Sequence, residues 1–367
     1  MKLLTTCILA LLGTLIVLTG CIDSAVNEPA QGGLIYGAKI YTHEGDMKIL
    51  FDEWSHLGFN TIVSSVELNQ NEEFRKQAAT HNIDRFIILP TFQDPAALER
   101  DPSLWAITRE GKRAESDWVK FVCPSRKEFR AEKIAAAAEI VRECSPAGIS
   151  IDFIRHFVFW ETVFPDRTLE TLPNTCFCDH CMERFQEDTG IAIPLPLETP
   201  SQKAEWLLEH HLDAWTAWKC GLITSMVDEL VDAAKEVNPD IKVNLHSVPW
   251  RRDDFGGARR IVTGQDLVAI SEMVDYISPM TYSHMVKQEP EWAHSVVADM
   301  AEQVSCPIVP SIQVSRAYLD EEFTREQFAE ALSWSLQAPS HGVVFWSWDA
   351  LNSAPDKKAI VQKMLGK

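Results

Sequence analysis

The chain has 367 residues, of which 46% are hydrophobic and 24% are charged, and its formal net charge is −19. This composition is typical of a folded protein with one large core or two modest ones, and it excludes an extended disordered chain. The acidic balance, with no cluster of Lys and Arg, argues against a surface that binds nucleic acid or anionic lipid.

The first twenty residues predict an export signal. One Lys is followed by an apolar run from Leu3 to Leu18 and then by the letters LTG before Cys21, a layout typical of an exported segment rather than a membrane span. The segment resembles the bacterial lipoprotein signal, in which the cysteine is lipidated after cleavage. This resemblance implies a signal peptide over residues 1–20 and a lipid anchor on Cys21. Plain secretion with a chance cysteine is the alternative.

Residues 21–33, with one Pro and a Gly pair, have the composition of a short tether. Asp23 stands two places after Cys21 rather than one, so the sequence lacks the usual signal for retention at the inner membrane. We therefore expect a protein of the bacterial cell envelope that is anchored in the outer membrane.

From residue 34 onward, apolar runs of strand length alternate with amphipathic stretches of helix length, as expected for parallel strands joined by crossover helices. The predicted strands are Leu34–Ile40, Asn60–Ser64, Arg85–Leu89, Gly148–Phe153, Ile241–Leu245, Tyr276–Met280, Ile308–Ile312 and Val343–Trp346. The predicted helices are Asp46–Leu57, Glu72–His81, Arg126–Glu143, Gln202–Val237, Gly264–Val274, Glu289–Val304, Thr324–Gln337 and Asp356–Leu365. Eight such pairs predict one α/β domain, a (β/α)8 TIM barrel over residues 34–367, with a doubly wound sheet as the weaker alternative.

Two connections are much longer than the usual few residues, which is typical of functional or covalently stapled loops. The first follows strand 3 and runs from Pro90 to Ser125, and the second follows strand 4 and runs from His156 to about Ser201. Because both follow the carboxyl ends of strands, they are expected to stand over the mouth of the barrel.

The chemistry of such a barrel belongs at the carboxyl ends of its strands. The candidates there for binding substrate are Lys39, Glu67, Arg155, His156, His246, Tyr282, Gln313, Trp346 and Trp348. Sugars are held by hydrogen bonds around an apolar face, which these residue types supply, although a lone His or Tyr is more often a core residue. Trp346 and Trp348 alternate along the last strand, so one of them can face the mouth as a stacking platform.

Three cysteines with the spacing C-x-C-x-x-C, namely Cys176, Cys178 and Cys181, lie on the second long loop. They are too crowded for disulfides with one another, whereas thiolates at this spacing can occupy three corners of a tetrahedron. Cys123 on the first long loop is our choice for the fourth ligand of a structural Zn²⁺ site, with His180 as the fallback. Disulfides in an oxidising envelope are the alternative, although setting aside Cys7 and Cys21 leaves seven cysteines, an odd number.

The stretches FVCPSRKEFR, with Cys123, and TCFCDHCMERF resemble the zinc staple of the β-galactosidases of glycoside hydrolase family 42, in which four such cysteines hold the metal. That family carries an Asn-Glu pair after the fourth strand and a Glu after the seventh. Here Asp152 and Gln313 stand near those places. The resemblance therefore implies the barrel and the staple, and it does not extend to the catalytic pair.

Three further motifs resemble those of glycosyl-hydrolase-like barrels that have not been characterised. They are IDFIRH at 151–156, SPMTY at 278–282 and FWSWDAL at 345–351. The resemblance spans the whole barrel and implies a protein that acts on carbohydrate.

Hydrolysis of a glycosidic bond uses two carboxyl groups, and Asp152 is the first candidate. The alternation along its strand predicts that Ser150 and Asp152 face the barrel interior while Phe153 faces the helices. Arg155 nearby is expected to keep Asp152 ionised, which suits a nucleophile, a base or an electrostatic stabiliser. A purely structural Asp-Arg pair is the alternative.

Glu161 is the candidate for the second carboxyl group. Its apolar neighbours Trp160 and Phe164 are expected to raise its pKa, as a general acid requires. Simple loop packing is the alternative. Asp349 is the runner-up for this role and Glu67 comes third.

These features predict a glycoside hydrolase that acts on an oligo- or polysaccharide and needs no catalytic cofactor. A glycan-binding lipoprotein without catalysis is the alternative, because Gln313 stands where many such barrels keep a Glu. Metal-assisted hydrolysis through His156, His246 and His284 ranks last, because these histidines share no close motif.

Overall fold

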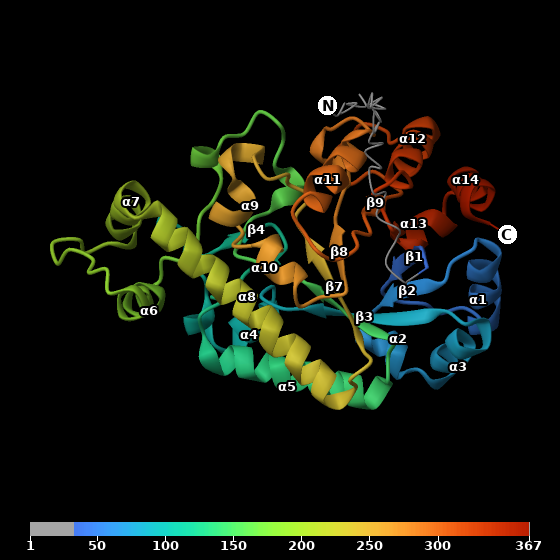
Figure 1. Cartoon of the computed structure of the whole chain (residues 1–367), viewed down its shortest axis with the longest axis horizontal. Helices are drawn as coiled ribbons and strands as arrows, with labels where there is room; N and C mark the ends of the chain where they lie inside the picture. The colour runs from blue at the N-terminus through green and yellow to red at the C-terminus, as the bar shows by residue number, and fades with distance from the viewer. Residues whose placement is uncertain (1–32, 367) are drawn as a thin grey trace, which may run out of the picture. The chain divides into compact units, whose positions relative to one another are not determined.

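Eight parallel strands form one sheet that closes on itself (Figure 1). The computed structural model describes residues 33–366. The strands are β1 (Ile35–Ile40), β2 (Thr61–Ser64), β3 (Asp84–Pro90), β6 (Gly148–Asp152), β7 (Lys242–Ser247), β8 (Tyr276–Pro279), β9 (Ser311–Gln313) and β10 (Gly342–Trp346). Their order is β8-β7-β6-β3-β2-β1-β10-β9, and the ring closes where Ile277 N–H donates to the Pro307 carbonyl and Val309 N–H to the Ile277 carbonyl. The predicted (β/α)8 barrel is confirmed.

Helices follow the strands and cover the outside of the barrel. They are α1 (Met47–His56), α2 (Val66–Gln70), α3 (Glu72–His81), α5 (Lys127–Cys144), α8 (Leu212–Val237), α9 (Ala258–Ile261), α10 (Leu267–Ser271), α11 (Trp292–Ala301), α12 (Arg325–Ser335), α13 (Trp348–Asn352) and α14 (Pro355–Leu365). The longest of them, α8, runs beside α5 along one flank (Figure 1).

Several predicted boundaries differ from the structure, among them the following three. The helix predicted over 202–237 is two helices, α7 (Pro200–His210) and α8, because the backbone at His211 leaves helical geometry with φ −139° and ψ 31°. The helix predicted over 264–274 is only the short α10. The seventh strand starts at Ser311 rather than Ile308, because Pro307 and Pro310 have no N–H for a ladder.

The interior of the barrel changes from apolar to polar along its axis. At the amino-terminal ends of the strands, an apolar plug is formed by Val63, Phe86, Ile88, Val309 and Val344. Above it, buried polar side chains bond to one another across the barrel. Asn244 donates to Ser150 Oγ at 2.7 Å, and Ser278 Oγ donates to Asn244 Oδ1 at 2.8 Å. The carboxyl ends of the strands therefore rest on a rigid, satisfied network.

The two long loops carry their own short elements. They are α4 (Pro95–Arg100), η1 (Pro102–Leu104), β4 (Glu115–Ser116) and β5 (Val119–Lys120) in the first loop, and η2 (Trp160–Thr162), η3 (Leu169–Thr171), α6 (Asp179–Thr189) and α7 in the second. Backbone hydrogen bonds join the loops: Arg109 N–H donates to the Asn174 carbonyl at 3.0 Å, and Phe177 N–H donates to the Ile107 carbonyl at 2.8 Å.

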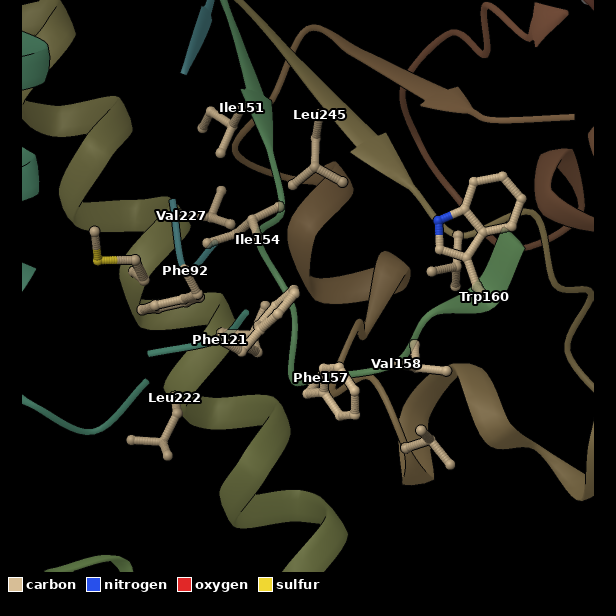
Figure 2. Close-up of a cluster of buried hydrophobic side chains, with 14 of the residues drawn as sticks. Phe92, Phe121, Ile151, Ile154, Phe157, Val158, Trp160, Leu222, Val227 and Leu245 are labelled. Atoms are coloured by element: carbon tan, nitrogen blue, oxygen red, sulfur yellow. The ribbon is translucent and has the colours of Figure 1, made fainter. Parts of the chain in front are cut away.

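An apolar core fixes these loops to the barrel beneath them. Figure 2 shows Phe121 of the first loop and Phe157 of the second among side chains from β6 and α8. Trp160 is fully buried in the same cluster, directly before Glu161. Burying an aromatic side chain stabilises by roughly 1.5 to 3 kcal/mol, so these residues hold the second loop firmly.

The predicted signal peptide (1–20), Cys21 and all of the predicted tether before residue 33 lie outside the described residues. Within residues 33–366, no helix has the length and apolar character needed to cross a membrane.

The parallel pairing of β1 with β10 generates a test of stability. Gly342 begins β10 with φ +125°, and a Cβ there would lie 1.8 Å from the Ile35 carbonyl oxygen. We expect Gly342→Ala to lower the free energy of unfolding by more than about 3 kcal/mol in urea titrations. Gly221→Ala is the control, because nothing lies within 4 Å of its Cβ on α8, and it should stabilise by up to about 1 kcal/mol. Equal unfolding midpoints for the two variants would contradict this account.

Candidate active site

A cavity of about 300 Å³ opens at the carboxyl ends of the strands, within the size range of small-molecule sites. Its lining residues are Lys39, Tyr41, Trp118, Asp152, Phe153, Arg155, Trp160, Glu161, Met280, Tyr282, Met285, Tyr318 and Trp346. Both carboxyl groups predicted from the sequence therefore lie in one cavity whose other walls are largely aromatic.

Asp152 is the last residue of β6 and its side chain is only 8% exposed. Its Oδ1 accepts a hydrogen bond from Phe153 N–H at 2.7 Å. Phe153 lines the cavity, and the prediction that it faces the helices is wrong. The strand ends at Asp152, and Phe153 takes the left-handed φ of +50°, which breaks the alternation. A bulky residue in this conformation is held by its surroundings, which is common at functional sites.

Glu161 lies in η2 and its side chain is also 8% exposed. Burial raises its pKa to about 7, against the opposing charge of Arg155. Its Oε2 is buried and has no hydrogen-bond partner among the described residues. Near neutral pH this carboxyl group therefore retains its proton in a large share of molecules. Because it lines the cavity, it can donate that proton to a molecule bound there.

Two cations accompany the carboxyl groups. Burial lowers the pKa of Lys39 to about 8, while Asp152 and Glu161 counteract part of this effect. The Arg155 guanidinium lies over the rings of Phe121 and Phe153, at 4.9 and 5.5 Å. Its Nη1 donates to the Val158 carbonyl at 2.8 Å, so the hydrogen bond goes to backbone and the charge acts on the carboxylates through space.

His246 connects Lys39 to the network below the cavity. Lys39 Nζ lies 3.4 Å from His246 Nδ1, and His246 Nε2 lies 2.8 Å from Ser150 Oγ. Burial and the neighbouring Lys39 charge lower the pKa of His246 to about 3, so the ring is neutral. A neutral ring that accepts from Lys39 at Nδ1 carries its proton at Nε2, where it donates to Ser150.

Aromatic rings form one wall of the cavity. Tyr282 stacks on Trp346 with the ring centroids 5.0 Å apart and the planes 18° apart, and its hydroxyl lies 3.2 Å from Ser311 Oγ. Of the two tryptophans predicted to alternate, Trp346 faces the cavity, while Trp348 is buried in the outer core against Trp54.

Gln313 and His156 are buried away from the cavity. Gln313 Oε1 accepts from Met285 N–H at 2.8 Å and its Nε2 donates to the Ser315 carbonyl at 2.9 Å, so its amide orders two loops. His156 is fully buried next to Gly264, and burial lowers its pKa well below the usual value.

The remaining acidic candidates do not line the cavity. Glu67 is exposed on α2 and Asp349 is exposed on α13. The three histidines proposed for metal-assisted hydrolysis are not brought together either: within the described residues, the one group of His, Cys, Asp or Glu side chains close enough to hold a metal is the cysteine cluster.

Other cavity residues were not among the predicted site residues. Tyr318 follows β9 and is an isolated aromatic residue in a polar stretch, which is the signal that could have drawn attention to it. Met280 stands inside the SPMTY motif and Met285 shortly after it. Methionines at such places are hard to separate from core residues by sequence alone.

The four predicted cysteines come together. The sulfur atoms of Cys123, Cys176, Cys178 and Cys181 all lie within 4.8 Å of one another and are buried. Cys123 Sγ is 3.7 Å from Cys178 Sγ and 3.3 Å from Cys181 Sγ. Four sulfurs around a zinc ion stand about 3.8 Å apart, whereas a disulfide needs about 2.05 Å. The cluster is close enough to bind a metal ion.

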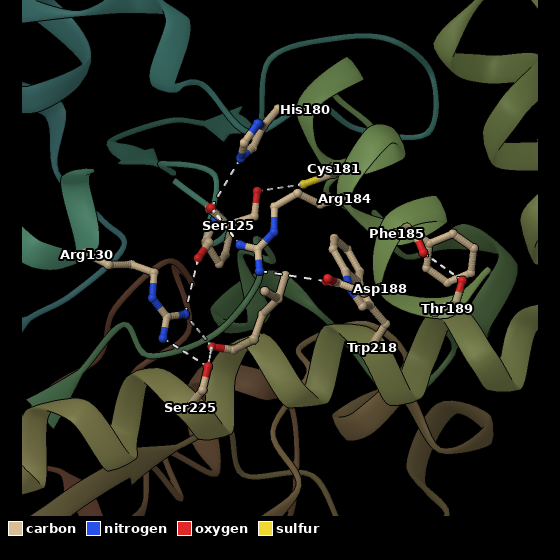
Figure 3. A network of polar contacts seen from close by, with 12 residues as sticks. Ser125, Arg130, His180, Cys181, Arg184, Phe185, Asp188, Thr189, Trp218 and Ser225 are labelled. Carbon is tan, nitrogen blue, oxygen red and sulfur yellow. Dashed lines mark hydrogen bonds and ion pairs between the residues drawn. The ribbon is translucent and has the colours of Figure 1, made fainter. Parts of the chain in front are cut away.

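Hydrogen-bond donors surround the sulfurs, as is usual around metal-bound thiolates. Ile107 N–H donates to Cys176 Sγ at 3.3 Å. Ser125 Oγ lies 3.2 Å from Cys181 Sγ (Figure 3). His180, the fallback ligand, instead directs its Nε2 to the Ser125 carbonyl at 3.3 Å. The donor set is therefore four cysteines from two loops.

No protein-family model matches the sequence, and no curated protein matches it. Solved structures do match. The glycoside hydrolase domain of PgaB (BpsB) from Bordetella bronchiseptica aligns with a TM-score of 0.65 and 10% identity, over 89% of this chain and 98% of that one. A β-galactosidase from the psychrophilic Marinomonas ef1 aligns with a TM-score of 0.67 and 11% identity, over 90% and 59%.

Gan42B, a GH42 β-galactosidase from G. stearothermophilus, aligns with a TM-score of 0.63 and 12% identity, over 92% of this chain and 57% of that one. The chain thus spans less than two thirds of the length of these β-galactosidases. The resemblance to family 42 is confirmed for the barrel fold. At identities this low, fold similarity does not establish a shared function.

The burial of Glu161 generates a test of stability against pH. Its pKa rises from 4.5 in the unfolded chain to about 7 in the folded protein, which corresponds to about 3 kcal/mol. Its contribution is fully present below pH 4.5 and is lost as the pH rises through 7. We expect Glu161→Gln to match the parent at pH 4.5 and to exceed it by up to about 3 kcal/mol at pH 8, measured by urea unfolding. The exposed Glu67→Gln should show no such difference, and parallel curves for Glu161→Gln and its parent would refute the assignment.

Proposed function

We propose that the protein is a glycoside hydrolase that acts on an oligo- or polysaccharide, with Asp152 and Glu161 as its carboxyl pair. The observation that carries this proposal is the presence of both groups in one aromatic-walled cavity, in different environments. Burial keeps Glu161 protonated to about pH 7, whereas Asp152 accepts a backbone hydrogen bond and lies near the Lys39 charge. Two carboxyl groups whose environments differ in this way suit an acid and its partner.

In this mechanism Glu161 donates its proton to the oxygen of the leaving sugar while the bond from that oxygen to the anomeric carbon breaks. Asp152, as the carboxylate, acts opposite as nucleophile or as base for water. One water is consumed for each bond, and its hydroxyl ends on the anomeric carbon. Its second proton returns to Glu161 when Asp152 is the nucleophile. When Asp152 is the base, Asp152 takes that proton and releases it to solvent, from which Glu161 regains its own. The stacked Tyr282 and Trp346 offer an apolar face to a sugar ring, and Lys39 and Arg155 line the same cavity beside the two carboxyl groups.

The fold comparisons support the class of reaction, because the matched proteins include a glycoside hydrolase domain and several β-galactosidases. Gln313 gives no support to loss of catalysis, because its amide is engaged by backbone groups outside the cavity.

We also propose that the protein acts at the outer membrane, where a lipid on Cys21 anchors it; the signal-like sequence supports this location. Its proposed partner is carbohydrate. The acidic net charge argues against nucleic acid as a partner.

We further propose that the cysteine cluster holds a structural zinc ion. Four buried thiols without an ion would leave any thiolate charge uncompensated, whereas a divalent ion neutralises the charge and links the two loops. The ion supplies folding energy and takes no part in the reaction.

Substitution of the carboxyl groups tests the reaction. We expect Asp152→Asn and Glu161→Gln each to lower kcat at least 100-fold on a glycan selected from a screen of plant, algal and host polysaccharides. Glu161→Gln should retain more activity on aryl glycosides with a good leaving group, which needs no proton. Asp349→Asn, which alters an exposed group outside the cavity, is the control and should stay within about twofold of the parent. Glycan binding without turnover in the parent would favour the non-catalytic alternative.

Elemental analysis tests the zinc ion. The purified protein is expected to hold about one equivalent of zinc. Cys123→Ser removes one of the four ligands, so it should lose most of the zinc. Its free energy of unfolding in urea should fall by several kcal/mol. Cys144→Ser, at a buried thiol on α5 outside the cluster, should keep the metal. Thiol titration that finds these cysteines oxidised to disulfides would overturn the zinc assignment.

A further inference from the structure

Two half-exposed aromatic residues meet over the cavity. Trp118 Nε1–H donates a hydrogen bond to the Tyr318 hydroxyl at 2.9 Å, although the residues are 200 positions apart in the sequence. Trp118 belongs to the turn between β4 and β5, and Tyr318 to the loop after β9. They are 42% and 43% exposed, and both line the cavity that holds the carboxyl pair. We call Trp118 and Tyr318 the aromatic bridge.

The topology of the barrel shows what this bridge spans. Trp118 lies in the connection that follows β3, and Tyr318 lies in the connection that follows β9. In the closed ring of eight strands, β3 and β9 are four places apart, so they stand on opposite sides of the barrel. A hydrogen bond between their loops therefore crosses the opening at the carboxyl ends of the strands.

Phe159, from the loop after β6, supports the bridge. Its ring packs edge-to-face against Trp118, with centroids 6.1 Å apart, and against Tyr318, with centroids 5.3 Å apart. Phe153 packs against Trp118 from within the cavity, at 5.9 Å. Edge-to-face pairs of this kind are favourable beyond the area that they bury, so the bridge is a packed structure and not a chance contact of two surface side chains.

A bridge across the mouth decides which part of a polymer can reach the carboxyl groups. An open groove lets a chain lie across the barrel with sugars on both sides of the cleaved bond. A cavity of about 300 Å³ whose mouth is crossed by the Trp118–Tyr318 hydrogen bond instead admits a chain end. Resting on the proposed hydrolase function, we propose that the protein is exo-acting, that it releases one small sugar unit from a chain end, and that the aromatic bridge enforces this choice. The exposed faces of Trp118 and Tyr318 then stack the next sugars of the same chain.

The test uses end-labelled oligosaccharides prepared from each polysaccharide of the screen, together with the same oligosaccharides blocked at one end or the other. The parent protein is expected to release single sugar units from one end only, with little loss of polymer viscosity at early times. Blocking that end should reduce the rate at least tenfold, because the cavity then receives no free terminus.

Variants of the bridge separate its packing from its hydrogen bond. Trp118→Ala removes the ring that spans the opening, and we expect the ratio of internal to terminal cleavage to rise at least tenfold. Trp118→Phe and Tyr318→Phe each remove the hydrogen bond and keep an aromatic ring, so their effects on this ratio should be smaller and non-additive in the double variant. Tyr36→Phe, near the amino-terminal end of β1, is the matched control and should leave the ratio unchanged.

The outcomes distinguish this inference from the function on which it rests. Internal cleavage by the parent from the first time point, or equal rates on free and blocked ends, overturns exo action and leaves the hydrolase proposal standing. A ratio that does not change in Trp118→Ala overturns the role of the bridge. Failure to hydrolyse any oligosaccharide or aryl glycoside overturns both proposals.

Discussion

The candidate site depends on four buried sulfur atoms, contributed by two loops, that lie within 4.8 Å of one another. One of these loops carries Trp118, and the other carries Glu161 and Phe159. Neither loop belongs to the regular barrel, and long loops of this kind are ordinarily the most mobile parts of a fold. Clustered cysteines, backbone bonds between the loops and the shared core around Phe121 and Trp160 together hold both loops over the strand ends.

Below the loops, the barrel places the two carboxyl groups in the different environments that the proposed hydrolysis requires. Asp152 stands at a strand end, close to Lys39, whose amine contacts the neutral His246 and through it the polar network of the barrel interior. Glu161 belongs to the second long loop, whose apolar packing removes its carboxyl group from water and raises its pKa. The two carboxyl groups therefore differ because one rests on the polar interior of the barrel and the other on the apolar core of the loops.

In the proposed hydrolase, the same arrangement separates the residues of catalysis from those that select the substrate. The carboxyl pair is set by β6 and the turn η2, whereas the opening is set by the aromatic bridge between the loops after β3 and β9. Under the proposed function, changes in those two loops alter which glycan enters without disturbing Asp152 or the network beneath it. This division is the general advantage of barrels whose sites are built from loops.

The sequence alone determined the barrel, because strand-length apolar runs and amphipathic helices record burial directly in their periodicity. It also determined the cysteine cluster, since ligand spacing is local and only Cys123 had to come from elsewhere. It named Asp152 and Glu161, but only the tertiary structure showed that they share a cavity. Tertiary packing alone decided that Gln313 and Trp348 are turned away from the cavity, because their orientations depend on side-chain partners. Phe153 is turned toward the cavity because its backbone is left-handed at the end of the strand. The bridge from Trp118 to Tyr318 joins loops from opposite sides of a closed ring, and no local pattern encodes a contact 200 residues apart.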